Sequence, residues 1–131
     1  MTKKSLGFTV IELIFIAVLI GAASVIFFVQ KNNLEIVAND DAKKTAINAM
    51  YYGIEEVFYP ANKYYPATIS SDNIKSIDPA LFTDPNGIKL GEIGSEYSYS
   101  PTNCAENQCK GYVLKATLSK EADFTKTNRN N

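Results

Sequence analysis

One apolar run, from Phe8 to Val29, constrains the fold of this chain more than any other feature, and Glu12 is its only formal charge. As a helix this run would be roughly 33 Å long, at about 1.5 Å per residue. The hydrocarbon core of a bilayer is about 30 Å thick. The rest of the chain is polar enough to be soluble. The sequence therefore predicts a transmembrane helix over residues 8–29 that carries one small globular head.

Glu12 is the unusual residue in this run. A carboxylate within a spanning helix costs free energy and usually needs a partner, yet no basic residue lies inside the run. One interpretation is that the side chain reaches back to the lipid headgroups. The other is that cleavage between Gly7 and Phe8 creates an α-amino group, with a pKa of about 8, one helical turn upstream. That amine, on the same chain or on a packed neighbour, would be a cationic partner for Glu12.

The segment Gly7-Phe8-Thr9-Val10-Ile11-Glu12-Leu13 resembles the processing signal of type IV prepilins and of the related type II secretion pseudopilins. In that family a membrane peptidase removes a short basic leader after a glycine and methylates the new N-terminal residue. The resemblance implies cleavage between Gly7 and Phe8 and N-methylation of Phe8. It also implies that Glu12 serves in assembly, by pairing with the terminal amine of the adjacent subunit.

The leader, residues 1–7, also fits this resemblance. Lys3 and Lys4 make it basic and favour a cytoplasmic N-terminus. A secretory signal is cleaved after its apolar region, whereas cleavage here would precede that region and retain the helix. The alternative is a plain signal anchor that is not cleaved.

Two positions later in the span bear on helix flexibility and packing. Gly21 falls where many family members have a glycine that loosens the helix, and three more small residues follow it. These side chains either let neighbouring helices approach closely or are ordinary composition for a span. Val29 stands where many members have a proline, so a proline kink is not expected there.

Residues 30–59 change from uniformly apolar to amphipathic, which predicts the helix of the head. Their apolar residues recur at spacings of three and four and form one stripe along a helix. The stripe consists of Ile47, Met50, Ile54 and Val57. The acidic pairs Asp40-Asp41 and Glu55-Glu56 are predicted to lie on a solvated face. Pro60 is expected to end this helix, because proline disfavours a helical conformation in the residue before it.

Residues 60–94 are rich in Pro, Gly, Asn, Asp and Ser, which predicts a long connecting loop. In the family, the corresponding region contributes to contacts between subunits. Four local features are expected within it. They are a helical turn at 72–77, a helix start at Asp78-Pro79, a turn at 84–87 and a short strand at 88–90.

Residues 95–131 are expected to form an antiparallel sheet that ends in a polar tail. Alternation of apolar and polar residues predicts strands at 96–100 and 111–118. A hairpin loop over 101–111 would join them, and an edge strand is expected near 123–125. The sheet would cover the apolar stripe of the helix. We therefore predict an α+β fold, with one long N-terminal helix packed against a small antiparallel sheet.

Cys104 and Cys109 are the only cysteines, and both fall in the predicted hairpin loop outside the membrane. A zinc site is not expected, because the chain has no histidine and only two thiols. Thiol redox chemistry usually needs the closer C-x-x-C spacing. We therefore expect a disulfide that makes the hairpin locally rigid.

The sequence does not predict an enzyme. It has no histidine and none of the nucleophile, phosphate-binding or metal-ligand motifs that indicate catalysis, so no cofactor is expected. Calcium binding by loop Asp and Asn residues stays open, without a recognisable spacing to predict it. The formal net charge of −1 gives no electrostatic reason to expect nonspecific binding of nucleic acid.

The resemblance implies a structural subunit. Prepilin peptidase would process the precursor in the inner membrane, and an assembly platform there would draw it from the lipid. The N-terminal helices would then pack as a homo-oligomeric helical filament on the cell surface, a pilus used for adhesion or motility. Two alternatives stay open. One is a pseudopilin of a type II secretion or DNA-uptake machine, and the other is a membrane-tethered binding protein that never polymerises.

Overall fold

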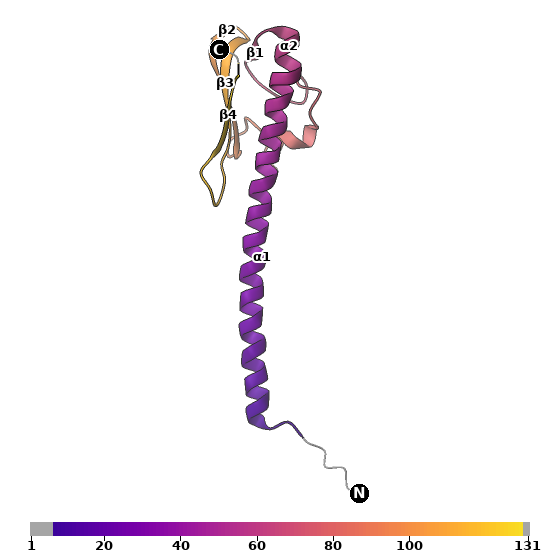
Figure 1. Cartoon of the computed structure of the whole chain (residues 1–131), viewed down its shortest axis with the longest axis vertical. Coiled ribbons are helices and arrows are strands. Elements are labelled where there is room, and N and C mark those ends of the chain that lie inside the picture. The colour runs from indigo at the N-terminus through magenta and orange to yellow at the C-terminus, as the bar shows by residue number, and fades with distance from the viewer. Residues whose placement is uncertain (1–6, 130–131) are drawn as a thin grey trace. The chain divides into compact units, whose positions relative to one another are not determined.

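The computed structural model describes residues 7–129 of the chain (Figure 1). Its internal contacts divide the chain into two units, Met1–Glu35 and Ile36–Asn131, and each is described by itself. Most of the predicted leader, with Lys3 and Lys4, lies outside the described residues.

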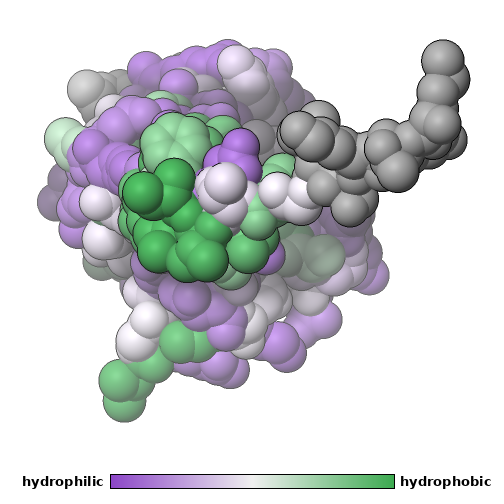
Figure 2. All heavy atoms as spheres, turned by 90° about the horizontal axis from the view of Figure 1, so that it is seen from below, coloured by the Kyte–Doolittle hydropathy of each residue, from purple (hydrophilic) through white to green (hydrophobic). Residues whose placement is uncertain are grey.

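Helix α1 runs from Val10 to Tyr52, and its first half is the predicted apolar span. Every residue from 7 to 32 is exposed, so the apolar side chains of this part cover no core of their own. The helix is long and apolar enough to cross a membrane. Figure 2 shows apolar side chains gathered in a cluster near the middle of the view, with a smaller apolar group at its lower left edge.

The prediction that the helix ends at Pro60 is wrong. After α1 the chain forms a π-helix, η1 (Gly53–Phe58), and then a further turn of α-helix, α2 (Tyr59–Asn62). Pro60 lies in the first turn of α2, which continues η1 without leaving the helical conformation, since Phe58 and Tyr59 are both right-handed helical and the Tyr59 N–H donates to the Ile54 carbonyl. Lys63 ends the helix in the left-handed conformation, with a φ of 64°.

The predicted apolar stripe is confirmed for three of its four residues. Ile47, Met50 and Ile54 are fully buried, whereas 52% of Val57 is exposed. Val57 lies in η1, and a π-helix needs more residues per turn than an α-helix. Spacings of three and four therefore no longer keep a residue on the buried face, and Val57 turns outward.

The sheet has four antiparallel strands in the order β1-β3-β2, and β4 also pairs with β3. They are β1 (Tyr65–Pro66), β2 (Tyr97–Ala105), β3 (Gln108–Ala116) and β4 (Phe124–Thr127). Strand β1 was not predicted, because two residues, one of them a proline, give no alternating pattern. The predicted hairpin loop 101–111 is wrong. Strands β2 and β3 continue through it, and only Glu106 and Asn107 form the turn.

The buried face of the sheet covers the helix as predicted. Tyr112, Leu114 and Ala116 of β3 are buried, and Leu118 continues their alternation beyond the strand. They pack in one core with Ile47 and other buried residues of the head helix. The α+β fold is therefore confirmed.

The connecting segment matches its predictions in part. Asp78 caps the short 3₁₀ helix η2 (Pro79–Phe82) by accepting a hydrogen bond from the N–H of Ala80 at 2.9 Å. The turn at 84–87 is also confirmed, since the N–H of Gly87 donates to the Asp84 carbonyl at 2.9 Å. Residues 72–77 form turns rather than a helix, and 88–90 make a single bridge at Lys89 instead of a strand.

Candidate functional site

Glu12 lies in the first turn of α1, where Thr9, just before the helix, holds its side chain. The N–H and the hydroxyl of Thr9 donate to Oε2 of Glu12 at 2.8 and 3.0 Å. The N–H of Glu12 donates to Oγ of Thr9 at 3.3 Å in return. This reciprocal pair is a capping box, which satisfies N–H groups that a helix start otherwise leaves unpaired. It was not predicted, although Thr9-Val10-Ile11-Glu12 is the T-x-x-E pattern that signals it.

The capping box gives Glu12 a hydrogen-bond partner within its own chain. Two hydrogen bonds from Thr9 already stabilise the carboxylate, so its place in the apolar run does not by itself require a cation. These hydrogen bonds do not, however, neutralise the negative charge of the Glu12 carboxylate. The second oxygen, Oε1, meets no hydrogen-bond donor within residues 7–129. A cation therefore has an open oxygen to approach.

Gly7 and Phe8 come immediately before the capping box, and both are exposed. Phe8 and Glu12 line the same hollow on the surface of the first helical turns, together with Ile11 and Phe15. The structure thus brings the two residues of the predicted assembly site together. Cleavage between Gly7 and Phe8 stays a prediction.

Gly21 lies in α1 with open space around it, since a Cβ built at this position would meet nothing within 4 Å. Nearby, the hydroxyl of Ser24 donates to the carbonyl of Ile20 at 2.7 Å. This bond within the helix satisfies the one polar side chain of the small-residue surface. Close approach of another apolar helix at this surface stays a prediction.

Two acids that were predicted to be solvated are instead buried in the head. Asp40 is 3% exposed and Glu55 is 5% exposed, whereas their neighbours Asp41 and Glu56 lie on the surface. Adjacent residues of an α-helix point about 100° apart, so Asp40 faces inward where Asp41 faces outward. In η1 the wider π-helical turn rotates Glu55 toward the sheet. The apolar pattern does not signal either burial.

Asp40 and Lys43 connect helix α1 to the residues that follow β3. The Asp40 carboxylate accepts hydrogen bonds from the N–H groups of Ser119 and Lys120 at 3.0 and 3.1 Å. Burial acts against the charged form of Asp40, but these bonds, with Lys43 beside it, outweigh that effect and lower its pKa.

Lys43 is the buried cation of this cluster and is 2% exposed. Its Nζ lies 2.9 Å from Oε2 of Glu96 and 3.4 Å from Oδ1 of Asp40. It also donates to the carbonyl of Thr117 at 3.1 Å. Three acceptors satisfy the three donors of the ammonium group, so this cluster is a structural support.

Glu55 joins η1 to three other parts of the head. It accepts hydrogen bonds from the hydroxyls of Tyr65 and Tyr112 at 3.2 and 2.9 Å, and from the N–H of Arg129 at 3.2 Å. Burial, together with the bond to Glu55, raises the pKa of Tyr112 above its usual value. Tyr112 therefore keeps its proton and continues to donate.

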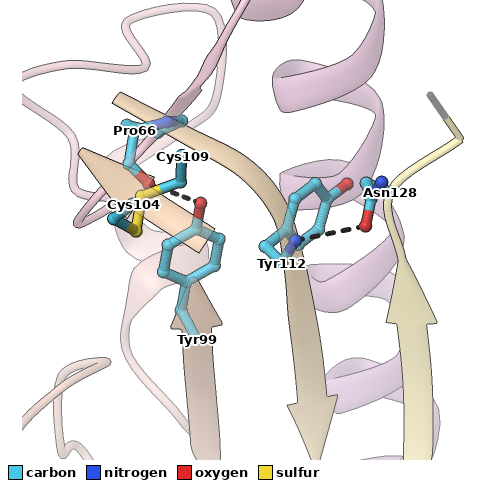
Figure 3. Close-up of a disulfide and its surroundings, with 6 residues drawn as sticks. All are labelled: Pro66, Tyr99, Cys104, Cys109, Tyr112 and Asn128. Atoms are coloured by element: carbon cyan, nitrogen blue, oxygen red, sulfur yellow. Dashed lines mark hydrogen bonds between the residues drawn. A yellow bond between two sulfur atoms is a disulfide. The ribbon is translucent and has the colours of Figure 1, made fainter. Parts of the chain in front are cut away.

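The predicted disulfide between Cys104 and Cys109 is present. The two residues are direct partners across the β2–β3 hairpin. Figure 3 shows the disulfide beside Pro66 and Tyr99, whose hydroxyl donates to the Pro66 carbonyl at 2.7 Å. The hairpin tip is thus held where β1 joins β3.

The described part of the chain has no group of three or more His, Cys, Asp or Glu residues arranged to hold a metal ion. No family model, curated protein or solved structure matches the chain.

Proposed function

We propose that this chain is a subunit of a type IV pilus-like filament, which the membrane holds before assembly. The observation that carries the proposal is that every residue from 7 to 32 is exposed, although Phe8 to Val29 are apolar or uncharged apart from Glu12. Such a surface needs lipid or other apolar helices to cover it. The resemblance of residues 7–13 to a prepilin signal favours helices of the same chain as the final cover.

In this proposal, prepilin peptidase cleaves the precursor after Gly7 and leaves Phe8 with a free α-amino group. The amine of one subunit pairs with Glu12 of its neighbour. Thr9 orients the carboxylate through Oε2, and the ammonium group approaches Oε1. A charge-assisted bond of this kind offsets the cost of removing both groups from water. It also fixes the axial register, and an inner-membrane assembly platform moves the subunit from lipid into the surface fibre.

The substitution Glu12→Ala tests the pairing. We expect membrane insertion and leader cleavage to continue, while the yield of filaments in the sheared surface fraction falls. Glu35→Ala is the matched control, because Glu35 is also an exposed acid of α1 but lies outside the apolar run. Normal filament yield in the Glu12 variant would contradict the pairing.

The cleavage site has its own test. Gly7→Leu should leave an uncleaved precursor of lower electrophoretic mobility, and mass spectrometry of the unmodified protein should find a chain that begins with methylated Phe8. An unchanged mature band in the variant would refute cleavage at this bond. If the chain occurs only in membranes and never in surface fibres, it is instead a tethered binding protein.

A further inference from the structure

We propose that the head binds an acidic saccharide, a sugar that carries a carboxylate, in a hollow beside the disulfide hairpin. The hollow has a volume of about 330 Å³, within the range of about 300–1,000 Å³ that is typical of small-molecule sites. Its polar and aromatic lining comes from the helix end, β2 and β3. These residues are Tyr59, Lys63, Tyr64, Asn103, Gln108 and Lys110.

Two positive charges gather at this hollow without a negative partner. Lys63 and Lys110 are exposed, and neither makes an ion pair within residues 7–129, whereas Lys43, Lys44 and Lys115 do. No carboxylate lines the hollow. The chain as a whole has a formal net charge of −1, whereas the charged residues that line the hollow are both positive. The charge indicates an anionic ligand.

Two aromatic rings of fixed orientation indicate a ligand with a flat apolar face. The ring of Tyr59 stacks on the buried ring of Tyr65 with their centroids 4.6 Å apart. The ring of Tyr64 packs edge-on against Phe58 at 5.7 Å. A tyrosine offers an apolar ring and a hydroxyl together, which suits a sugar ring with its C–H face and its hydroxyl groups.

Two side-chain amides favour a sugar over a simple phosphate as the ligand. Asn103 and Gln108 each carry a donor and an acceptor, and sugar hydroxyls can use both, whereas a fully ionised phosphate only accepts. Nucleic acid fits less well, because its affinity depends on neutralising many closely spaced phosphates. Two lysines on a chain of net negative charge would neutralise few phosphates. A saccharide with one carboxylate per ring matches the sparse charge of the hollow.

The walls of the hollow are held before any ligand arrives. The pairs Tyr65–Cys109 and Pro66–Gln108 join β1 to β3 at its edge, and the Cys104–Cys109 disulfide joins β2 to β3 there (Figure 3). A binding site that is already ordered loses less conformational entropy when a ligand binds. The disulfide hairpin thus has a place in recognition as well as in stability.

The test uses the full-length chain in detergent micelles and trigalacturonate as the probe, with binding measured by calorimetric titration. We expect saturable binding that weakens with added salt and with the methyl-esterified, uncharged form of the probe. Lys63→Gln and Lys110→Gln should each weaken binding about three- to tenfold, by loss of a charge-assisted contact. Lys89→Gln is the matched control, because Lys89 is also exposed but lies outside the hollow, and its affinity should not change.

Several results would overturn this proposal. They are the absence of saturable binding, equal binding of the esterified probe, and equal affinity in all three lysine variants. Tighter binding of a single-stranded DNA oligonucleotide than of trigalacturonate would assign the hollow to nucleic acid instead. Unchanged thermal unfolding of the variants excludes misfolding as the cause. The proposal goes beyond filament assembly and does not rest on it, because the assay needs no polymer.

Discussion

The side chain of Glu12 accepts a hydrogen bond of 3.0 Å from the hydroxyl of Thr9, one residue beyond the proposed new N-terminus. The acid that is proposed to bind the amine of a neighbouring subunit therefore also caps its own helix. Both roles can coexist because they use different oxygens of one carboxylate. Thr9 is then a positioning residue for assembly.

Thr9→Val tests the capping box. Valine keeps the shape of threonine but lacks the hydroxyl, and we expect the helix start to lose about 1 kcal/mol of stability. Amides of residues 10–13 should then exchange with solvent faster in micelles, as nuclear magnetic resonance or mass spectrometry can measure. Thr9→Ser keeps the hydroxyl and is the control. Equal exchange in the valine variant and the unmodified chain would show that the capping box contributes nothing.

Gly53→Ala should destabilise the head. A Cβ at this position would lie 2.5 Å from Cδ1 of Ile77 and 2.7 Å from its Cγ1. Overpacking of this kind costs about 1–3 kcal/mol, which should lower the urea midpoint followed by the tyrosine circular dichroism of the head. Gly21→Ala is the matched control, because its Cβ meets nothing within 4 Å. A head that unfolds at the same urea concentration in both variants would contradict the close approach at Gly53.

Glu55→Ala should cost more than Glu56→Ala. The first change leaves the hydroxyls of Tyr65 and Tyr112 and the N–H of Arg129 without their acceptor. Tyr112 is buried, and a buried donor left unsatisfied costs about 1–3 kcal/mol. The second change removes an exposed ion pair with Arg129, typically worth about 0–1 kcal/mol. Equal unfolding free energies for the two variants would contradict the role of Glu55 in the core.

Asp40 should make the head sensitive to acid. Its pKa is lowered in the folded state, so its contribution to stability is complete above the unfolded pKa of about 3.9. That contribution is lost as the pH falls through the folded pKa. Asp40→Asn should reduce stability at pH 7 and flatten its decline between about pH 5 and pH 3, as thermal unfolding can measure. Asp41→Asn is the exposed control. An equally steep decline in the Asp40 variant would show that other acids cause it.

The sequence predicts the fold where side chains alternate regularly. Apolar spacing identifies Ile47, Met50 and Ile54, and the alternation of β3 identifies Tyr112 and its neighbours. It does not identify β1, because two residues carry no period. The extent of the β2–β3 hairpin also escapes it, since polar residues in an exposed ladder resemble a loop.

The buried charges of the head depend on partners far along the chain. Asp40 bonds to backbone groups at Ser119 and Lys120, and nothing local to Asp40 signals this. The capping box is different. Thr9 and Glu12 lie at the T-x-x-E spacing that is typical of a capping box, and this spacing is visible in the sequence.

The wide helical turn in η1 places the acid Glu55 in the core of the head and leaves the aliphatic Val57 on its surface. Were Gly53–Phe58 wound as an ordinary α-helix instead, the spacing of three residues between Ile54 and Val57 would keep both on one face. Val57 would move back toward the stripe, and Glu55 would swing away from its two tyrosines. The winding of this short segment therefore determines whether the core of the head receives an aliphatic side chain or an acid.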